Sequence, residues 1–228
     1  MENGAVRFLI DAGLGPRTLA ARLAGIGRDL TDLTAVFLTH EHTDHIRGAG
    51  SLARKLRVPI YATAGTHSHL KRHLPVGADF RSLQAEDSVR LGNVTVESYP
   101  TPHDGDETVA FVVRCGGRKL GHATDLGTVD AVVRDKLRDC DALLVEANHD
   151  PAMLESGPYP YFLQQRIGGG LGHLSNAACG DLIAGVAHAG LQTVVLMHLS
   201  ASNNHPDLAR EHALRALGGR PVRLLVSR

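Results

Sequence analysis

A short run of metal-ligand side chains follows an apolar segment near the amino terminus. Residues 39–45 read Thr-His-Glu-His-Thr-Asp-His and come directly after apolar residues 35–38, which are typical of a buried strand. His40 and His42 are two positions apart on extended backbone, so both imidazoles point the same way and can reach one metal ion. Asp44 and His45 follow in the turn and offer an oxygen and a nitrogen to a second ion. This mixture of imidazole and carboxylate suits zinc, manganese or iron, whereas the alternative is a polar loop that is merely rich in histidine.

Further ligand-type residues follow later strands. His103, Asp125 and His198 each come just after an apolar or alternating segment that we predict to be a strand. Any one of them alone could simply cap a turn. Together with the first run they make five histidines and two aspartates, which is enough for two four- or five-coordinate ions, and Asp125 could bridge both with its two oxygens. The set contains no cysteine, which favours a hydrolytic site with open positions over a closed structural one.

The elements that must position these residues alternate along the chain without a linker. We expect strands at residues 6–10, 59–62, 89–91, 94–99, 108–115, 119–123, 142–146, 192–197 and 221–226. We expect helices at residues 16–23, 49–56, 66–74, 128–137, 176–189 and 206–217. This order predicts an α/β fold in which sheets are enclosed by helices, formed by a single domain over residues 1–228.

Composition restricts the class without naming the function. The 228 residues carry a net charge of +0 and only 4% aromatic residues, with no Trp, so neither a basic surface nor a base-stacking platform is visible in the sequence. A local basic groove remains compatible with this neutral balance. The three cysteines form no Cys-x-x-Cys pair, which is typical of reduced thiols in a cytosolic protein. No apolar run approaches the roughly 18 residues of a membrane span, and the first residues lack the features of a signal peptide, so we expect a cytoplasmic location.

The order His-x-His-x-Asp-His after a strand, followed by His, Asp and His, resembles the signature of the metallo-β-lactamase superfamily. The resemblance implies an αββα sandwich of two mixed sheets flanked by helices. It implies that one metal is held by His40, His42 and His103, that the other is held by Asp44, His45 and His198, and that Asp125 bridges the two. It also implies a structural role for Asp11, in Leu-Ile-Asp-Ala-Gly at residues 9–13, as a brace for the histidine run.

Longer motifs are similar to the WalJ (YycJ) branch of this superfamily. They cover residues 36–42, 99–104, 146–150, 157–160, 172–176 and 198–204. Members of this branch are described as bacterial, cytosolic, metal-dependent 5′→3′ DNA exonucleases, so the resemblance implies DNA as the substrate. Members usually begin with an additional strand and a Gly-Ser-Ser-Gly-Asn loop. This chain begins after that point, so we expect it to lack both.

A glycine-rich segment ends in a further histidine. Residues 168–172 read Gly-Gly-Gly-Leu-Gly and lead into His173, and a helix is expected to begin near Ser175. Such a loop can bring backbone N–H groups close to an anion, or it can be an ordinary flexible loop before a capped helix. The spacing resembles the tRNA-maturing phosphodiesterases of the same superfamily, which implies that His173 is a general acid. The branch resemblance also suggests that Asn148 and His149 contact the substrate or brace the site. Arg166, Tyr159 and Tyr161, in the segment before the glycines, could hold a phosphate or a base, and Gly172 could approach a phosphate as part of the glycine loop.

These residues predict a definite chemistry. Two metal ions about 3.5–4 Å apart would activate a water and neutralise charge on a phosphoryl transition state. Asp44 would orient or deprotonate that water, and His173 would protonate the departing oxygen.

The leading hypothesis is a phosphodiesterase acting on nucleic acid, as a DNA exonuclease. The sequence leaves two alternatives open. One is a hydrolase of small molecules such as a cyclic phosphodiester, a thioester or a lactone, and the other is a metal-binding sensor or scaffold without catalysis. Oligomeric state and the choice between zinc and manganese are also left open.

Overall fold

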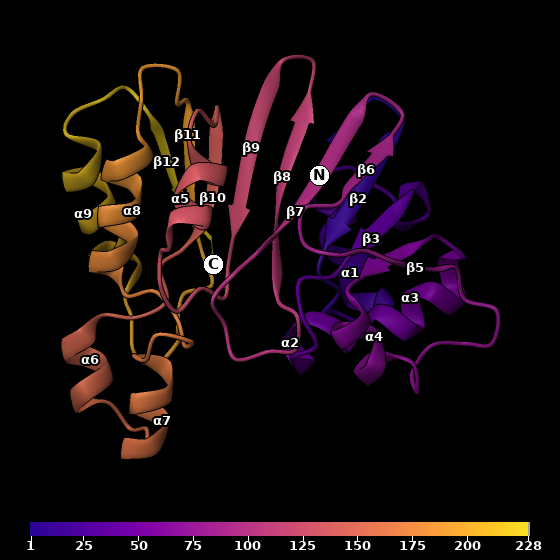
Figure 1. Cartoon of the computed structure of the whole chain (residues 1–228), viewed down its shortest axis with the longest axis horizontal. Helices are drawn as coiled ribbons and strands as arrows, with labels where there is room; N and C mark the ends of the chain where they lie inside the picture. The colour runs from indigo at the N-terminus through magenta and orange to yellow at the C-terminus, as the bar shows by residue number, and fades with distance from the viewer. Residues whose placement is uncertain (228) are drawn as a thin grey trace. The chain divides into compact units, whose positions relative to one another are not determined.

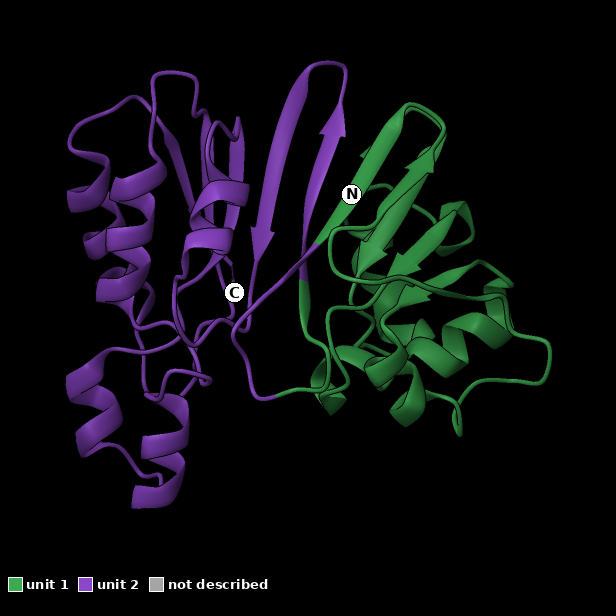
Figure 2. Ribbon diagram, in the orientation of Figure 1, with its two compact units in different colours: residues 1–98, 105–109 green, residues 99–104, 110–228 purple. Residues whose placement is uncertain are grey.

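The computed structural model describes residues 1–227, which divide into two compact units (Figure 2). Unit 1 comprises residues 1–98 and 105–109, and unit 2 comprises residues 99–104 and those from Ala110 onward. The chain passes between the units three times, so neither unit is one continuous segment. A single domain over the whole chain therefore stays a prediction.

Unit 1 contains a mixed five-stranded sheet in the order β1-β2-β3-β4-β5. Its strands are β1 (Glu2–Asn3), β2 (Val6–Ile10), β3 (Ala35–Phe37), β4 (Ile60–Ala62) and β5 (Phe80–Ser82). The short β1 runs antiparallel to β2, and the remaining pairs are parallel. All three residues of β3 are buried, as expected for a strand inside a parallel sheet that is covered on both faces. β3 is therefore a rigid support for the histidine run that follows it.

The helices of unit 1 pack on one face of this sheet. They are α1 (Pro16–Ala24), α2 (Thr43–Ile46), α3 (Ala49–Leu56) and α4 (Ala64–Leu70), with a 3₁₀ turn, η1 (Leu30–Asp32). Leu52 of α3 and Leu70 of α4 join Val36 of β3 in the apolar core, and all three side chains are fully buried. Phe37 points to the opposite face, because side chains alternate along a strand, and stacks on Tyr61 with 4.7 Å between the ring centroids. An antiparallel hairpin of β6 (Ser88–Leu91) and β7 (Val94–Pro100) also belongs to this part of the chain.

Unit 2 contains a second mixed sheet (Figure 1), in which β12-β11-β10-β9-β8 are neighbours in that order. The strands are β8 (Val109–Cys115), β9 (Arg118–Ala123), β10 (Ala142–Glu146), β11 (Thr193–Met197) and β12 (Arg223–Val226). β8 and β9 are antiparallel, and β9 to β12 are parallel. The carboxyl ends of β9, β10 and β11 therefore meet at one edge, with Val145 opposite Ala123 and Glu146 opposite Met197.

Helices cover the sheet of unit 2, and two further helices follow β10 (Figure 1). The bounds are α5 (Ala131–Leu137), α6 (Pro151–Ser156), α7 (Tyr161–Ile167), α8 (Asn176–Val186) and α9 (Pro206–Leu217). Leu137 of α5, Leu182 of α8 and Leu217 of α9 pack against Leu143 and Leu196 of the sheet. α8 begins where the Ser175 hydroxyl accepts a hydrogen bond from the N–H of Ala178, a standard helix cap.

Most predicted elements are present with shifts of a few residues at their ends. The strands at 6–10 and 142–146 and the helices at 49–56 and 206–217 have the predicted bounds. The predicted helix at 66–74 instead begins at Ala64 and ends at Leu70. The sequence interpretation missed β1, β5, η1, α2, α6 and α7, all of which are short. No helix within residues 1–227 combines the length and the apolar character that crossing a membrane requires.

Candidate metal centre

In unit 1 the histidine run is held in place by Asp11, which comes directly after β2. One Asp11 oxygen accepts the backbone N–H of Thr39 at 2.9 Å, and the other accepts Nδ1–H of His45 at 2.7 Å. The Thr39 hydroxyl lies 3.0 Å from both Asp11 oxygens, to which it donates, and so it can accept from Nδ1 of His40 at 2.9 Å. Through these hydrogen bonds Asp11 holds the ring of His45 directly and that of His40 by way of Thr39.

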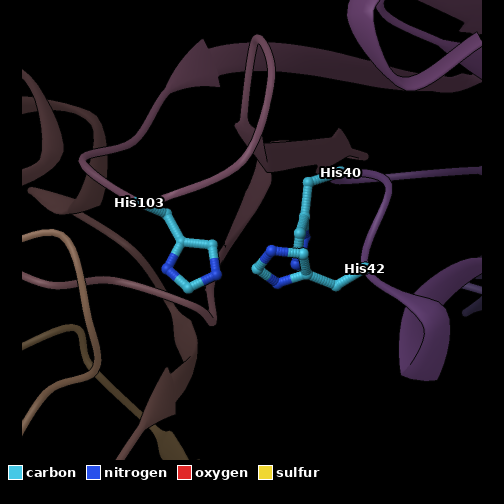
Figure 3. Close-up of side chains that lie close together, drawn as sticks. All are labelled: His40, His42 and His103. Atoms are coloured by element: carbon cyan, nitrogen blue, oxygen red, sulfur yellow. The ribbon is translucent and has the colours of Figure 1, made fainter. Parts of the chain in front are cut away.

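The predicted ligands of unit 1 lie on the loop that leads from β3 into α2. His40 and His42 have ring centroids 4.5 Å apart, and His40 and His45 have centroids 4.2 Å apart. Figure 3 draws His40 and His42, and it also draws His103, which belongs to unit 2. His40 and His45 are buried, whereas the Asp44 side chain is 67% exposed and lies 3.4 Å from Nε2 of His45. The loop from β2 is packed so closely here that a Cβ atom on Gly13 would lie 1.6 Å from the carbonyl oxygen of Asp44.

In unit 2 a buried carboxylate, Glu146 at the end of β10, holds two histidines. Its Oε1 accepts Nδ1–H of His173 at 2.8 Å and Nδ1–H of His198 at 2.7 Å. Its Oε2 accepts the backbone N–H groups of Leu126 and Leu174 at 2.9 and 3.1 Å. All four hydrogen bonds go to a side chain that is fully buried. One carboxylate therefore sets the orientation of the predicted acid and of a predicted metal ligand.

The electrostatics of this cluster favour a charged pair. Burial on its own lowers the pKa of His173, but the hydrogen bond to Glu146 and the charges of Glu146 and Asp125 outweigh it, so that the pKa is raised above 6.5. Burial on its own raises the pKa of Glu146, but the hydrogen bonds from His173 and His198 outweigh it and lower the pKa. His173 consequently keeps a proton at neutral pH more readily than an isolated imidazole does.

Asp125 lies at the centre of the unit 2 cluster. Its Oδ1 is 3.5 Å from Nδ1 of His198, 3.7 Å from Nδ1 of His173 and 3.8 Å from Nε2 of His103. His103 donates Nδ1–H to the carbonyl oxygen of Gly172 at 3.0 Å. Burial lowers the pKa of His103 despite the opposing charge of Asp125, which keeps this imidazole neutral, the form in which it can bind a metal.

The donor set fits divalent metal ions. In four predicted ligands Nδ1–H is donated to a fixed oxygen, and this leaves Nε2 as the nitrogen that would bind a metal. The oxygens belong to Thr39 for His40, Asp11 for His45, Gly172 for His103 and Glu146 for His198. Such partners on the second ring nitrogen are the usual support of metal-binding histidines. In unit 2 the ligand atoms of Asp125, Glu146, His173 and His198 lie within 4.8 Å of one another.

The four predicted substrate contacts have different surroundings. Asn148 donates its amide to the carbonyl oxygen of His198 at 2.9 Å and thus holds the turn after β11. Gly172 is packed against the end of α7, where a Cβ atom would lie 2.2 Å from the carbonyl oxygen of Arg166. Arg166 pairs with Asp104 at 2.5 Å. His149 is buried, and its Nδ1 meets no hydrogen-bond partner within residues 1–227.

Two features could not be recognised from the sequence. The sequence shows Glu146 as a carboxylate at the end of a predicted strand, two residues before Asn148. It does not show the role of Glu146, because that role depends on the residues of the strands beside β10. The second feature is a cavity of about 570 Å³ in unit 1, lined by Arg17 of α1 and by Arg54 and Lys55 of α3. None of these three cations forms an ion pair within the described part of the chain. No sequence signal could have identified this cluster, because its members are 37 positions apart.

Comparison with known proteins gives the class. A family model described as the beta-lactamase superfamily domain matches residues 6–199. The crystal structure of the metallo-beta-lactamase fold protein YhfI from Bacillus subtilis superposes with a TM-score of 0.75 at 18% identity, covering 100% of this chain and 87% of that one. This likeness confirms the α/β fold with two mixed sheets.

Two relatives define the position within that class. Exodeoxyribonuclease YycJ of Bacillus anthracis is 33% identical over 207 residues, which cover 90% of this chain and 78% of the relative. Exodeoxyribonuclease WalJ of Streptococcus pneumoniae serotype 2, strain D39, is 32% identical over 213 residues, which cover 92% and 79%. The chain therefore belongs to the metal-dependent hydrolases of the metallo-β-lactamase superfamily, in the branch that contains these two proteins.

Proposed function

We propose that this protein is a two-metal hydrolase that cleaves phosphodiester bonds, and that it acts as a 5′→3′ exonuclease on DNA. The observation that carries the proposal is the Glu146 carboxylate, which holds His173 and His198 through one oxygen. A protein that only bound a metal would have no need of a positioned proton donor, so this pairing argues against a purely sensory or scaffold role.

The proposed ligands come from both units. His40, His42 and His103 would hold one ion, Asp44, His45 and His198 would hold the other, and Asp125 would bridge them. When bound, two divalent ions, zinc or manganese, would supply an activated water and neutralise phosphoryl charge.

The residues of the chain divide the proton transfers between them. Asp44, the most exposed of the predicted ligands, would orient the attacking water or take its proton. His173, whose pKa is raised by its hydrogen bond to Glu146 and by the charges of Glu146 and Asp125, would give a proton to the departing oxygen. Glu146 would stabilise the charged imidazole before that transfer and hold its ring afterwards.

Two observations support DNA rather than a small molecule. Both reported relatives bear the name exodeoxyribonuclease. The chain as a whole has a net charge of +0, yet Arg17, Arg54 and Lys55 gather at one cavity without acidic neighbours in its wall. Such a cluster fits the phosphates of a polyanionic strand.

The test uses metal-reconstituted protein on three substrates in parallel: end-labelled DNA, a bis-aryl phosphate and a thioester. We expect cleavage of the DNA and, more slowly, of the aryl phosphate. Hydrolysis of the thioester alone would overturn the proposal and favour a small-molecule hydrolase. His173→Ala should reduce turnover about 10²–10⁴-fold while metal content stays unchanged. Loss of metal in that variant would make His173 a ligand instead of an acid.

The cationic cavity has a separate test. Replacing Arg54 and Lys55 by Gln should weaken DNA binding and lower the salt slope of log K by about 0.7–0.9 for each lost phosphate contact. Arg22, an exposed residue of α1 outside the cavity wall, provides the matched control Arg22→Gln. Equal slopes in the two variants would show that the cavity does not bind the strand.

A further inference from the structure

Unit 2 contains a cavity of about 810 Å³ beside the proposed acid. Its wall includes Glu155 of α6, Tyr161 and Gln165 of α7, and the first turn of α8, together with His149 and His173 from the segments that precede α6 and α8. The volume lies within the range of about 300–1,000 Å³ typical of small-ligand sites. A group bound there would lie directly next to His173.

The chemistry of the wall fits an uncharged aromatic group. No Lys or Arg is among the lining residues, so the cavity is not built to hold a phosphate. The side-chain amide of Gln165 makes no hydrogen bond within residues 1–227 and is available to the edge of a ligand. Burial lowers the pKa of His149, which therefore lines the wall as a neutral imidazole. Amides and neutral imidazole can donate and accept hydrogen bonds, as the edge of a nucleobase requires.

An exposed aromatic ring forms part of the cavity wall. The chain has nine Phe and Tyr residues, and two of them, Tyr161 and Phe162, are strongly exposed, at 74% and 73%. They are neighbours in the first turn of α7, but consecutive residues on a helix point in different directions. Tyr161 lines the cavity and Phe162 does not. Two rings of equal exposure thus differ in their access to the cavity.

We propose that this cavity binds one nucleobase of an unpaired strand end, with the ring of Tyr161 stacked on the base and Gln165 at its edge. The proposal rests on the proposed function, in that it takes nucleic acid as the substrate. A stacked base would hold the adjoining nucleotide next to His173, so the cavity would position the strand end for cleavage. Stacking tolerates any base, as an exonuclease without sequence preference requires.

The first test measures binding without cleavage. A short single-stranded oligonucleotide with 2-aminopurine at its terminal position is titrated in EDTA, and the quenching of its fluorescence reports stacking. We expect Tyr161→Ala to weaken binding about tenfold and to abolish quenching, because one base–aromatic stack has that strength. Tyr161→Phe should keep both signals, and the matched control Phe162→Ala should stay within about twofold of the original protein.

A second measurement separates this inference from the proposed function. Strands with a normal or an abasic terminal nucleotide are compared for kcat/KM. For the unmutated protein, kcat/KM should be about tenfold higher on strands with a normal terminal nucleotide than on strands with an abasic one. Tyr161→Ala should lose this preference while keeping its metal. Quenching that depends on Tyr161 in a protein that cleaves no DNA would support the base site and overturn the exonuclease. The base site would be overturned if Tyr161→Ala cleaved DNA with an unchanged preference for the normal terminal nucleotide. It would also be overturned if the only effect of Tyr161→Ala were a change in oligomeric state.

Discussion

Replacing Glu146 by Gln removes one charge and two hydrogen bonds from the centre of unit 2. The carboxylate accepts four hydrogen bonds, two on each oxygen, and its side chain is fully buried. An amide of the same shape has one accepting oxygen and one donating NH₂ group. It can therefore serve the two backbone N–H groups or the two histidine Nδ1–H groups, but not both. We expect it to keep the backbone pair and lose the histidines.

The loss can be given a magnitude. A hydrogen bond to a charged group contributes about 1.5–3 kcal/mol, so two of them amount to about 3–6 kcal/mol. Removing a buried charge offsets part of this, and we expect a net loss of about 3 kcal/mol. A chain of this size loses about 2–4 °C in Tm per kcal/mol, which gives a decrease of about 6–12 °C. Without its partner His198 should bind metal about 10–100-fold more weakly.

Calorimetry of the metal-free protein measures the Tm, and elemental analysis after dialysis measures the metal. Asp181→Asn is the matched control, because it makes the same carboxylate-to-amide change at an exposed position of α8. Its Tm should stay within about 2 °C of the original. A Glu146→Gln protein with unchanged Tm and full metal content would refute the claim that Glu146 orients both histidines.

Four further predictions concern His173, Asp11 and the cysteines. The rate should fall as pH rises through the raised pKa of His173, because only its protonated form can donate, and a pH profile of kcat tests this. Because the pKa of His173 is higher in the folded than in the unfolded state, protonation of His173 stabilises the metal-free fold, most fully below pH 6.5. This contribution is lost as pH rises through the pKa of the folded state, and urea unfolding at several pH values would detect the loss. Asp11→Asn should keep the left-handed backbone, which Asn tolerates, but weaken the hydrogen bond that orients His45. We expect about 10–100-fold weaker metal binding, measured by elemental analysis, and full metal occupancy would contradict this. Burial raises the pKa of the Cys140 thiol to about 11, so iodoacetamide at pH 8 should modify the half-buried Cys115 and spare Cys140, as peptide mass spectrometry would show.

The sequence could predict that the candidate ligands follow strands, because the ends of strands can be recognised in a sequence. His198 follows the apolar strand β11, Asp125 follows β9, and the histidine run follows β3, as predicted. The sheet order was not readable, and it decides which strand ends are neighbours. β10 lies between β9 and β11, so Glu146 comes between Asp125 and His198. A carboxylate at the end of an apolar segment does not by itself indicate which residues of other strands will lie beside it.

The short helices of unit 2 were missed for a related reason. Residues 157–160 and 168–172 are rich in Gly and Pro, which are typical of loops, and α7 has only seven residues between them. Its stability comes from tertiary contacts rather than helix propensity, because an isolated helix of this length does not form in water. Its exposed ring, Tyr161, could therefore be recognised as part of a cavity wall only from the structure.

Backbone conformation also distinguishes the candidate site. Asp11, Asp125 and His198 are three of the seven non-glycine residues with positive φ among residues 1–227, with values of 64°, 57° and 57°. A left-handed residue other than glycine costs about 1–2 kcal/mol, so each must be stabilised by its surroundings. Asp11 is stabilised by hydrogen bonds from Thr39 and His45, and His198 by its hydrogen bond to Glu146. Glycine would adopt this backbone at lower cost, but it would provide none of these contacts. Three of the seven left-handed positions thus carry side chains that the proposed chemistry needs.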